Sequence, residues 1–150
     1  MNTRVLLATA AGAVTIFVLG YLIFGVLHVL SYMNEHMVQY AGLNKATPDF
    51  VPLIFSNLVL AFLLAYTFNS WAKIRTVIGG FKGGAIIMFL IILSKDLSFM
   101  GYMNLFKGFL PVIVDILAET LRVALAGGVI GGVLGLMNKG AETARHQAQP

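Results

Sequence analysis

The chain has 150 residues, of which 59% are hydrophobic and only 11% are charged, and this composition indicates an integral membrane protein rather than a soluble domain. Its net charge of +4 does not indicate nucleic-acid binding, because the Lys and Arg residues are scattered beside apolar segments, where anionic lipid is the simpler partner. The absence of cysteine excludes disulfides, thiolate metal sites and thiol nucleophiles.

The sequence predicts an all-α fold, a polytopic transmembrane four-helix bundle that forms a single domain over residues 1–150. Four apolar segments are each long enough to cross the hydrocarbon core of a bilayer, which takes about 20 helical residues. A membrane barrel would instead show shorter segments of alternating polarity. The predicted spans cover residues 5–30, 51–71, 77–101 and 109–137.

The first apolar segment follows the polar stretch "MNTR" and in this respect resembles a secretory signal. It continues to Leu30, however, well beyond the roughly 7–15 apolar residues of a signal core, so we expect a retained membrane helix. After it, Met33, Met37 and Tyr40 recur at helical spacing beside polar residues. This pattern predicts a short interfacial helix over residues 31–43.

The basic residues outside the predicted spans, or inside them toward their ends, are unevenly distributed between the two sides. Because cytoplasmic loops carry an excess of Lys and Arg, both termini are expected to be cytoplasmic. That side contains Arg4, Lys73, Arg75, Lys82, Lys139 and Arg145, and the other contains Lys45, Lys95 and Lys107. Of these, Lys73, Arg75 and Lys82 are candidates for contact with a lipid headgroup.

Two glycine-rich stretches, "GGFKGG" (79–84) and "GGVIGGVLG" (127–135), have glycines at four-residue spacing. Such spacing lines up small surfaces on one side of a helix, which lets two helices approach closely. The third and fourth predicted spans are antiparallel, so we expect them to cross at these glycines, which are also suited to packing against another subunit. The residues are Gly79, Gly80, Gly83, Gly84, Gly127, Gly128, Gly131, Gly132 and Gly135.

Three charged residues interrupt the fourth apolar segment. Asp115, Glu119 and Arg122 are spaced i, i+4, i+7, so they fall within an arc of about 60° on one face of a helix. At about 1.5 Å per residue from Phe109, Glu119 and Arg122 lie near the bilayer midplane. Because a charge facing lipid at that depth costs several kcal/mol, we expect this face to turn into the bundle.

Polar residues on the other predicted helices lie at compatible depths. They are Lys95 and Asp96 on the third span, His28 at the end of the first and Asn57 in the outer part of the second. Together with the charged face of the fourth span, they are expected to form one polar cluster open toward the outside.

Two interpretations of this cluster remain open. In the structural interpretation, the charges pair with one another and specify how the helices associate. The expected pairs are Glu119 with Arg122, Lys95 with Asp115, and His28 with Asp96. In the functional interpretation, Glu119 or Asp115 carries a proton and Arg122 anchors an anionic ligand.

The cluster contains one more acidic than basic side chain. A charged His28, a protonated carboxyl group or a bound ligand must compensate, unless water enters the cluster. The acids are Asp96, Asp115 and Glu119, and the bases are Lys95 and Arg122.

Enzymatic chemistry has less support in the sequence. His28, His36 and His146 lack metal-ligand spacing, and neither HExxH nor a nucleophile elbow is present, so we expect no metal site and no cofactor. An acid and an arginine in a membrane pocket nevertheless leave lipid chemistry open as an alternative.

With its stretch "FVLGYLIFG" (17–25), its acidic fourth helix and its "GGVIGGVLG" segment, the chain resembles small uncharacterised four-helix membrane proteins of bacteria. The resemblance implies a bacterial inner membrane and no particular activity. Small multidrug transporters also have four helices and an essential membrane carboxylate, but theirs belongs to the first helix, whereas the first span here has no acid.

The sequence therefore favours a non-enzymatic assembly or binding module, either an accessory subunit or a binder of a small ligand. Its expected partners are membrane lipid and either further copies of itself or a larger membrane complex, without nucleic acid. The first alternative is a proton- or ion-coupled small transporter that uses Glu119 and Asp115. The second is a lipid-modifying membrane enzyme.

Overall fold

The computed structural model describes residues 3–42, 45 and 47–147, and within the last helix it does not describe the side chains of residues 139 and 141–147. The described chain is all-helical. Its elements are α1 (Thr3–Gly20), the π-helix η1 (Tyr21–Val26), α2 (Val29–His36), α3 (Phe50–Ser70), α4 (Val77–Tyr102) and α5 (Phe109–Gln147).

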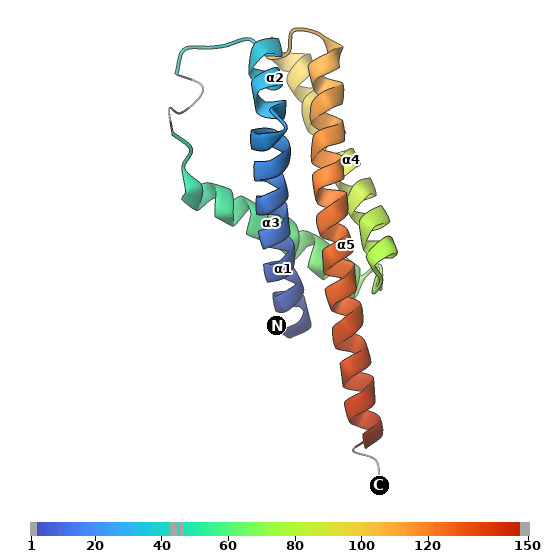
Figure 1. The fold of residues 1–150 in the computed structure, drawn as a ribbon. Helices are drawn as coiled ribbons and strands as arrows, with labels where there is room; N and C mark the ends of the chain where they lie inside the picture. Colours follow the sequence, from blue (N-terminus) through green and yellow to red (C-terminus); the bar gives the residue numbers. More distant parts are fainter. Residues whose placement is uncertain (1–2, 43–44, 46, 148–150) are drawn as a thin grey trace.

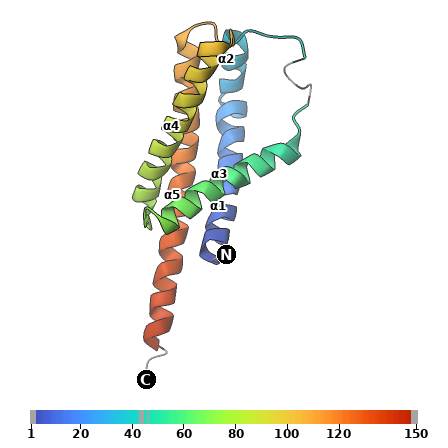
Figure 2. The same ribbon diagram turned by 180° about the vertical axis from the view of Figure 1, so that it is seen from behind.

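Three long helices, α1, α4 and α5, run side by side, and the start of α1 and the end of α5 lie toward the same end of this group (Figure 1). The fourth long helix, α3, crosses them obliquely, as the opposite view also shows (Figure 2). The architecture is therefore all-helical, as predicted, whereas the predicted count of four spanning helices stays a prediction. It consists of three aligned helices, one crossing helix and the short α2.

Small residues explain why α3 crosses rather than aligns. A Cβ atom built on Gly12 of α1 would lie 3.3 Å from Cβ of Ala61 on α3, so the two helices approach closely at this pair. The buried residues of α3 all belong to its second half, whereas residues 50–56 are all exposed. The contact is thus confined to the crossing point and the second half of α3.

Both α3 and α4 begin at a side chain that caps the helix. Asp49 accepts a hydrogen bond from the backbone N–H of Val51 at 3.2 Å, and Thr76 accepts one from the N–H of Gly79 at 3.1 Å. Such caps satisfy N–H groups that have no partner within the helix. Pro52, in the first turn of α3, removes another such donor without loss.

Three helical segments of the described chain are long and apolar enough to cross a membrane. They are Thr3–Val26, Phe50–Ser70 and Val77–Tyr102, with mean hydropathies of 2.2, 2.0 and 2.1. By their length and apolar composition, these segments support a membrane protein. The longest helix, α5, has 39 residues and carries the three charges discussed above, and its crossing of the membrane stays a prediction.

The first apolar segment is not one regular helix up to Leu30. After Gly20 the helix widens into η1, where the backbone N–H of Leu27 donates to the carbonyl of Leu22 at 2.9 Å. His28 then adopts a left-handed conformation with φ 57°, which interrupts the helix before α2 begins at Val29.

The predicted interfacial helix over residues 31–43 corresponds to α2, which ends earlier, at His36. Beyond it the backbone pairs with the connection between α4 and α5 instead of continuing the helix. Val38 donates to the carbonyl of Leu105 at 2.8 Å, and Lys107 donates to that of His36 at 2.9 Å. Tyr40 adds a side-chain hydrogen bond to the same connection.

Helices α4 and α5 are in backbone contact at the glycine-rich stretches. A Cβ atom on Gly127 would collide with the carbonyl oxygen of Gly80, and one on Gly84 would lie 2.7 Å from that of Val123. One turn further, a Cβ on Gly131 would collide with the carbonyl oxygen of Thr76. This is the close crossing that the glycine spacing predicts, and it leaves no room for any side chain at the contact.

The remaining predicted glycines meet side chains, a neighbouring loop or, at Gly128, also the backbone carbonyl of Val77. Gly135 lies directly against the backbone of Arg75, in the connection between α3 and α4. The others lie beside Thr76 and Ile74 (Gly79), Ile74 and Phe68 (Gly83), and Val77 (Gly128 and Gly132).

Candidate functional site

A lysine held between two aspartates forms one part of the charged region. The Nζ atom of Lys95 lies 3.2 Å from Oδ1 of Asp96 and 3.3 Å from Oδ2 of Asp115, so it joins α4 to α5. Asp96 is completely buried, whereas the side chain of Lys95 is 42% exposed. The lysine thus connects a fully buried carboxylate to the surface of the helix pair.

The two aspartates are not satisfied to the same degree. Lys95 donates a hydrogen bond to Asp115 at 3.3 Å, but its approach to Asp96 is an ion pair without hydrogen-bond geometry. Oδ2 of Asp96 has no hydrogen-bond partner among the described residues. A buried carboxylate in this condition is costly, and such groups in proteins often have a function.

A second ion pair lies further along α5. Nη2 of Arg122 is 2.8 Å from Oε2 of Glu119, and both side chains are largely buried. The guanidinium group also lies over the ring of Phe24 in η1, 5.6 Å from its centroid. A Cβ atom on Gly20 would lie 2.9 Å from Nη1 of Arg122, so this glycine makes room for the arginine against α1.

The sequence patterns did not single out Gly20 and Phe24 as neighbours of the charged residues. Both belong to "FVLGYLIFG", the stretch that carries the resemblance to other membrane proteins. The register of α1 against α5 could have identified these neighbours, because the two helices are antiparallel and their contacts recur at eight-residue intervals. These contacts pair Arg4 with Asn138, Gly12 with Ile130 and Gly20 with Arg122.

The structure does not bring His28 and Asn57 into the charged region. His28 is exposed and makes no hydrogen bond or ion pair with Asp96, or with any other described side chain. Asn57 lies at a groove between α1 and α3. The predicted single cluster therefore divides into the group of Lys95 with its two aspartates and the pair of Glu119 with Arg122.

This division restricts how the excess negative charge is compensated. The pair of Glu119 and Arg122 is balanced, whereas the group of Lys95, Asp96 and Asp115 has two acids and one base. His28 makes no ion pair with a described carboxylate, so it does not supply the missing cation at this group. Of the predicted options, a bound proton, a ligand or water remain for this group.

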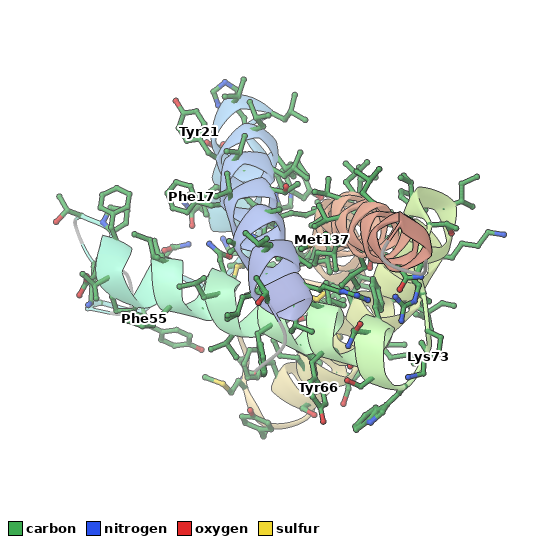
Figure 3. The ribbon with its side chains drawn as sticks, turned by 90° about the horizontal axis from the view of Figure 1, so that it is seen from below. Phe17, Tyr21, Phe55, Tyr66, Lys73 and Met137 are labelled. Carbon is green, nitrogen blue, oxygen red and sulfur yellow. The ribbon has the colours of Figure 1, made fainter. Side chains whose placement is uncertain are left out.

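The predicted headgroup residues are placed differently from one another. Arg75 donates from Nη1 to Oδ1 of Asn138 on α5 at 2.7 Å. Lys73 lies just beyond the end of α3 and is exposed, with its Nζ 3.4 Å from the carbonyl oxygen of Asn69 (Figure 3). Lys82 is exposed on α4. The three residues therefore do not form one described cluster.

An open apolar groove of about 330 Å³ separates α1 from the first half of α3. Seen along the helices, Phe17 projects from α1 on this side, whereas Phe55 projects from the opposite face of α3 (Figure 3). Asn57 is the one polar side chain among the described groove residues, which are Ala10, Ala13, Val14, Phe17, Ile54, Asn57 and Leu58.

Within the described part of the chain, no group of three or more His, Asp or Glu side chains is arranged to hold a metal ion. Comparisons with protein families, curated proteins and solved structures find no significant match. The resemblance to small bacterial membrane proteins therefore stays a prediction, and function has to be argued from the geometry.

Proposed function

We propose that this chain is a membrane-embedded assembly module, and that a second copy of it docks in the groove between α1 and α3. The observation that carries the proposal is the position of α3. Its first half leaves the other helices and exposes a continuous apolar surface over residues 50–55. This surface and the groove beside it are suited to packing against another helix.

The groove has the chemistry of a helix-packing surface in a membrane. Ala10 and Ala13 allow the backbone of a neighbouring helix to approach α1 closely. Asn57 supplies an amide in otherwise apolar surroundings, and lipid chains offer it no hydrogen-bond partner. An amide both donates and accepts, so Asn57 is self-complementary across a two-fold symmetric contact between copies.

The charged groups support the same function in another way. Lys95 joins α4 to α5, and Arg122 joins α5 to α1 and η1. These contacts hold the chain's own helices together and leave the groove, which they do not use, for assembly. The charges act as structural groups in this proposal, as in the structural interpretation of the sequence.

We further propose that the module lies in a bacterial inner membrane, crosses it four times and has both termini in the cytoplasm. The support is the excess of Lys and Arg on the side of the two termini, together with the length of α5. The resemblance stated above is the support for the bacterial membrane.

Cysteine cross-linking tests the docking of a second copy, because the natural chain has no cysteine. In native membranes, Ile54→Cys is expected to form a disulfide-linked dimer, since Ile54 lines the groove near the symmetry contact. Adding Asn57→Leu should lower the cross-linked fraction about threefold or more, the effect of losing roughly 0.6–1.7 kcal/mol. Electrophoresis without reductant measures both.

Ile86→Cys is the matched control, because Ile86 is 62% exposed on α4 and does not line the groove. It should give little dimer under the same oxidation. Equal cross-linking of both variants would contradict the specific contact. A cross-linked product of another mass would show a different protein in the groove and would overturn docking of a second copy.

A second candidate is proton-coupled transport, and the observation that favours it is the pair of aspartates sharing Lys95. The geometry favours Asp96 and Asp115 over Glu119 as the proton-carrying groups, because Glu119 is balanced by Arg122. Infrared spectroscopy is expected to detect the carbonyl band of a protonated carboxyl group at neutral pH. Asp96→Asn should remove this band, and Glu119→Gln should leave it unchanged.

The absence of that band from the unmodified protein would contradict the transport candidate, because no carboxyl group would then carry the exchangeable proton. Its persistence in Asp96→Asn would instead show that the proton resides on another group. The assembly proposal does not depend on either result, since it requires only that Lys95 holds α4 and α5 together.

A further inference from the structure

The group of Lys95, Asp96 and Asp115 reaches an exposed surface of α4 and α5. Lys95 lies seven residues, or about 10 Å, before the end of α4 at Tyr102, within a helix that is long and apolar enough to cross a membrane. Its side chain is nevertheless 42% exposed. Ionisable side chains at such a depth normally face the interior of a bundle or a water-filled cavity. The exposure of Lys95 therefore indicates that another group covers this surface in the membrane.

The oblique direction of α3 explains why the surface is open. On the side that α3 crosses, α5 lies between α1 and α4, and α3 passes well away from the end of α4 (Figure 2). The second half of α3 reaches α4 at Gly83, where a Cβ atom would lie 2.9 Å from Cε1 of Phe68. Lys95 lies twelve residues, or about 18 Å, further along α4. Helix α3 therefore does not cover Lys95.

The neighbours of Lys95 on α4 make the exposed surface polar. Ser94 and Ser98 are both exposed, and the hydroxyl group of Ser98 donates to the carbonyl of Ser94 at 2.8 Å. On the other side, Lys95 reaches Asp115 of α5 at 3.3 Å. Lipid chains offer such groups no hydrogen-bond partner. The surface is thus better suited to a polar group of another protein than to lipid.

The charge of the group defines the chemistry of that partner. Asp96 is completely buried, and neither of its carboxylate oxygens has a hydrogen-bond partner among the described residues. Because Lys95 is shared between two carboxylates, one negative charge remains in excess. A further cation at Asp115 would release Lys95 to form a charge-assisted hydrogen bond with Asp96. Two acids would then be paired with two bases.

A second copy of the chain is poorly suited to supply this cation. Lys95 and Arg122, which it would present from α4 and α5, already pair with carboxylates of their own chain. We infer that a transmembrane helix of a different protein docks over Lys95 and Asp115 and contributes a lysine or an arginine. This contact does not rest on the docking of a second copy between α1 and α3, because it uses other residues.

Binding of synthetic membrane helices to the purified protein in phosphatidylcholine vesicles tests the inference. Each probe is a helix of about 22 Leu and Ala residues. One probe carries a single lysine seven residues from its end, at the depth of Lys95, and the other carries leucine there. Energy transfer from the labelled protein to the labelled probe is expected to show about tenfold tighter binding of the lysine helix. Equal binding of the two helices would overturn the inference.

Asp96→Asn tests whether the excess charge attracts the lysine helix. The substitution removes one negative charge at a buried position and leaves the hydrogen bond between Lys95 and Asp115 in place. It should reduce the preference for the lysine helix to near one. Asp49→Asn removes the same charge from an exposed position before α3 and should leave the preference intact. Persistence of the preference in Asp96→Asn would show that the excess charge does not select the partner, and the inference would fail.

Ser98→Cys distinguishes a different protein from a second copy on this surface. Because the natural chain has no cysteine, oxidation of this variant in vesicles without a probe links two copies only where they meet at Ser98. No dimer is expected, since a second copy brings no unpaired cation to the surface. A disulfide-linked dimer of Ser98→Cys would identify a second copy as the occupant and would overturn the inference.

Discussion

Gly127→Ala is expected to lower the apparent unfolding midpoint of the detergent-solubilised protein by about 4–8 °C. The added methyl group would collide with the carbonyl oxygen of Gly80, a backbone atom that cannot rotate away. Overpacking of this kind costs up to about 3 kcal/mol, and the better helix propensity of alanine returns about 1 kcal/mol. The net loss is therefore about 2 kcal/mol, measured by thermal unfolding monitored by size-exclusion chromatography.

The adjacent residue provides the control. A Cβ atom on Gly128 would lie 3.4 Å from the carbonyl oxygen of Val77, an ordinary contact distance. Gly128→Ala is thus expected to leave the midpoint unchanged or to raise it slightly. Equal effects of the two substitutions would show that α4 and α5 are not in backbone contact at Gly127, and the close crossing would have to be abandoned.

The glycine crossing was predictable because its signal is local. Four-residue spacing in two antiparallel segments defines both the face and the depth of the contact from the order of the residues alone. The pairs of Glu119 with Arg122 and of Lys95 with Asp115 were predictable for a similar reason. A charge on an apolar helix must find an opposite charge nearby, and few were available.

The crossing of α3 was not predictable in the same way. Its apolar composition shows that it avoids water, but an almost uniformly apolar helix does not show which of its faces packs inward. The direction of α3 is decided by where Gly12 and Ala61 meet, a contact between residues far apart in sequence. For this reason Asn57 was assigned to the charged region and lies instead at the groove.

His28 and Arg4 were misjudged because the backbone, rather than the side chain, determines their positions. The left-handed conformation of His28 interrupts the helix. The position of its side chain therefore cannot be calculated from its depth along an ideal helix. Arg4 was counted only as a basic residue near a terminus. Its contact with Asn138 depends on the antiparallel alignment of α1 with α5 over their whole shared length.

Lys95→Met is expected to destabilise the protein by about 3 kcal/mol, the lower part of the range for removing one partner of a buried ion pair. The expected loss is in the lower part of this range because the side chain of Lys95 is 42% exposed and remains partly hydrated. Among the described residues, Lys95 is the cation that contacts both Asp96 and Asp115, so its removal leaves two carboxylates without an opposite charge. Thermal unfolding of the variant measures the loss.

Asp96→Asn separates this electrostatic effect from a general sensitivity of the site. The substitution keeps the shape of the buried side chain, removes the surplus negative charge and leaves the hydrogen bond between Lys95 and Asp115 in place. It should therefore be neutral or stabilising, and combining Lys95→Met with Asp96→Asn and Asp115→Asn should recover most of the stability lost in Lys95→Met. Destabilisation by Asp96→Asn as large as that by Lys95→Met would mean that the ionised Asp96 is itself required for the fold. The excess negative charge would then be compensated by a bound group at this position rather than by a proton on Asp96.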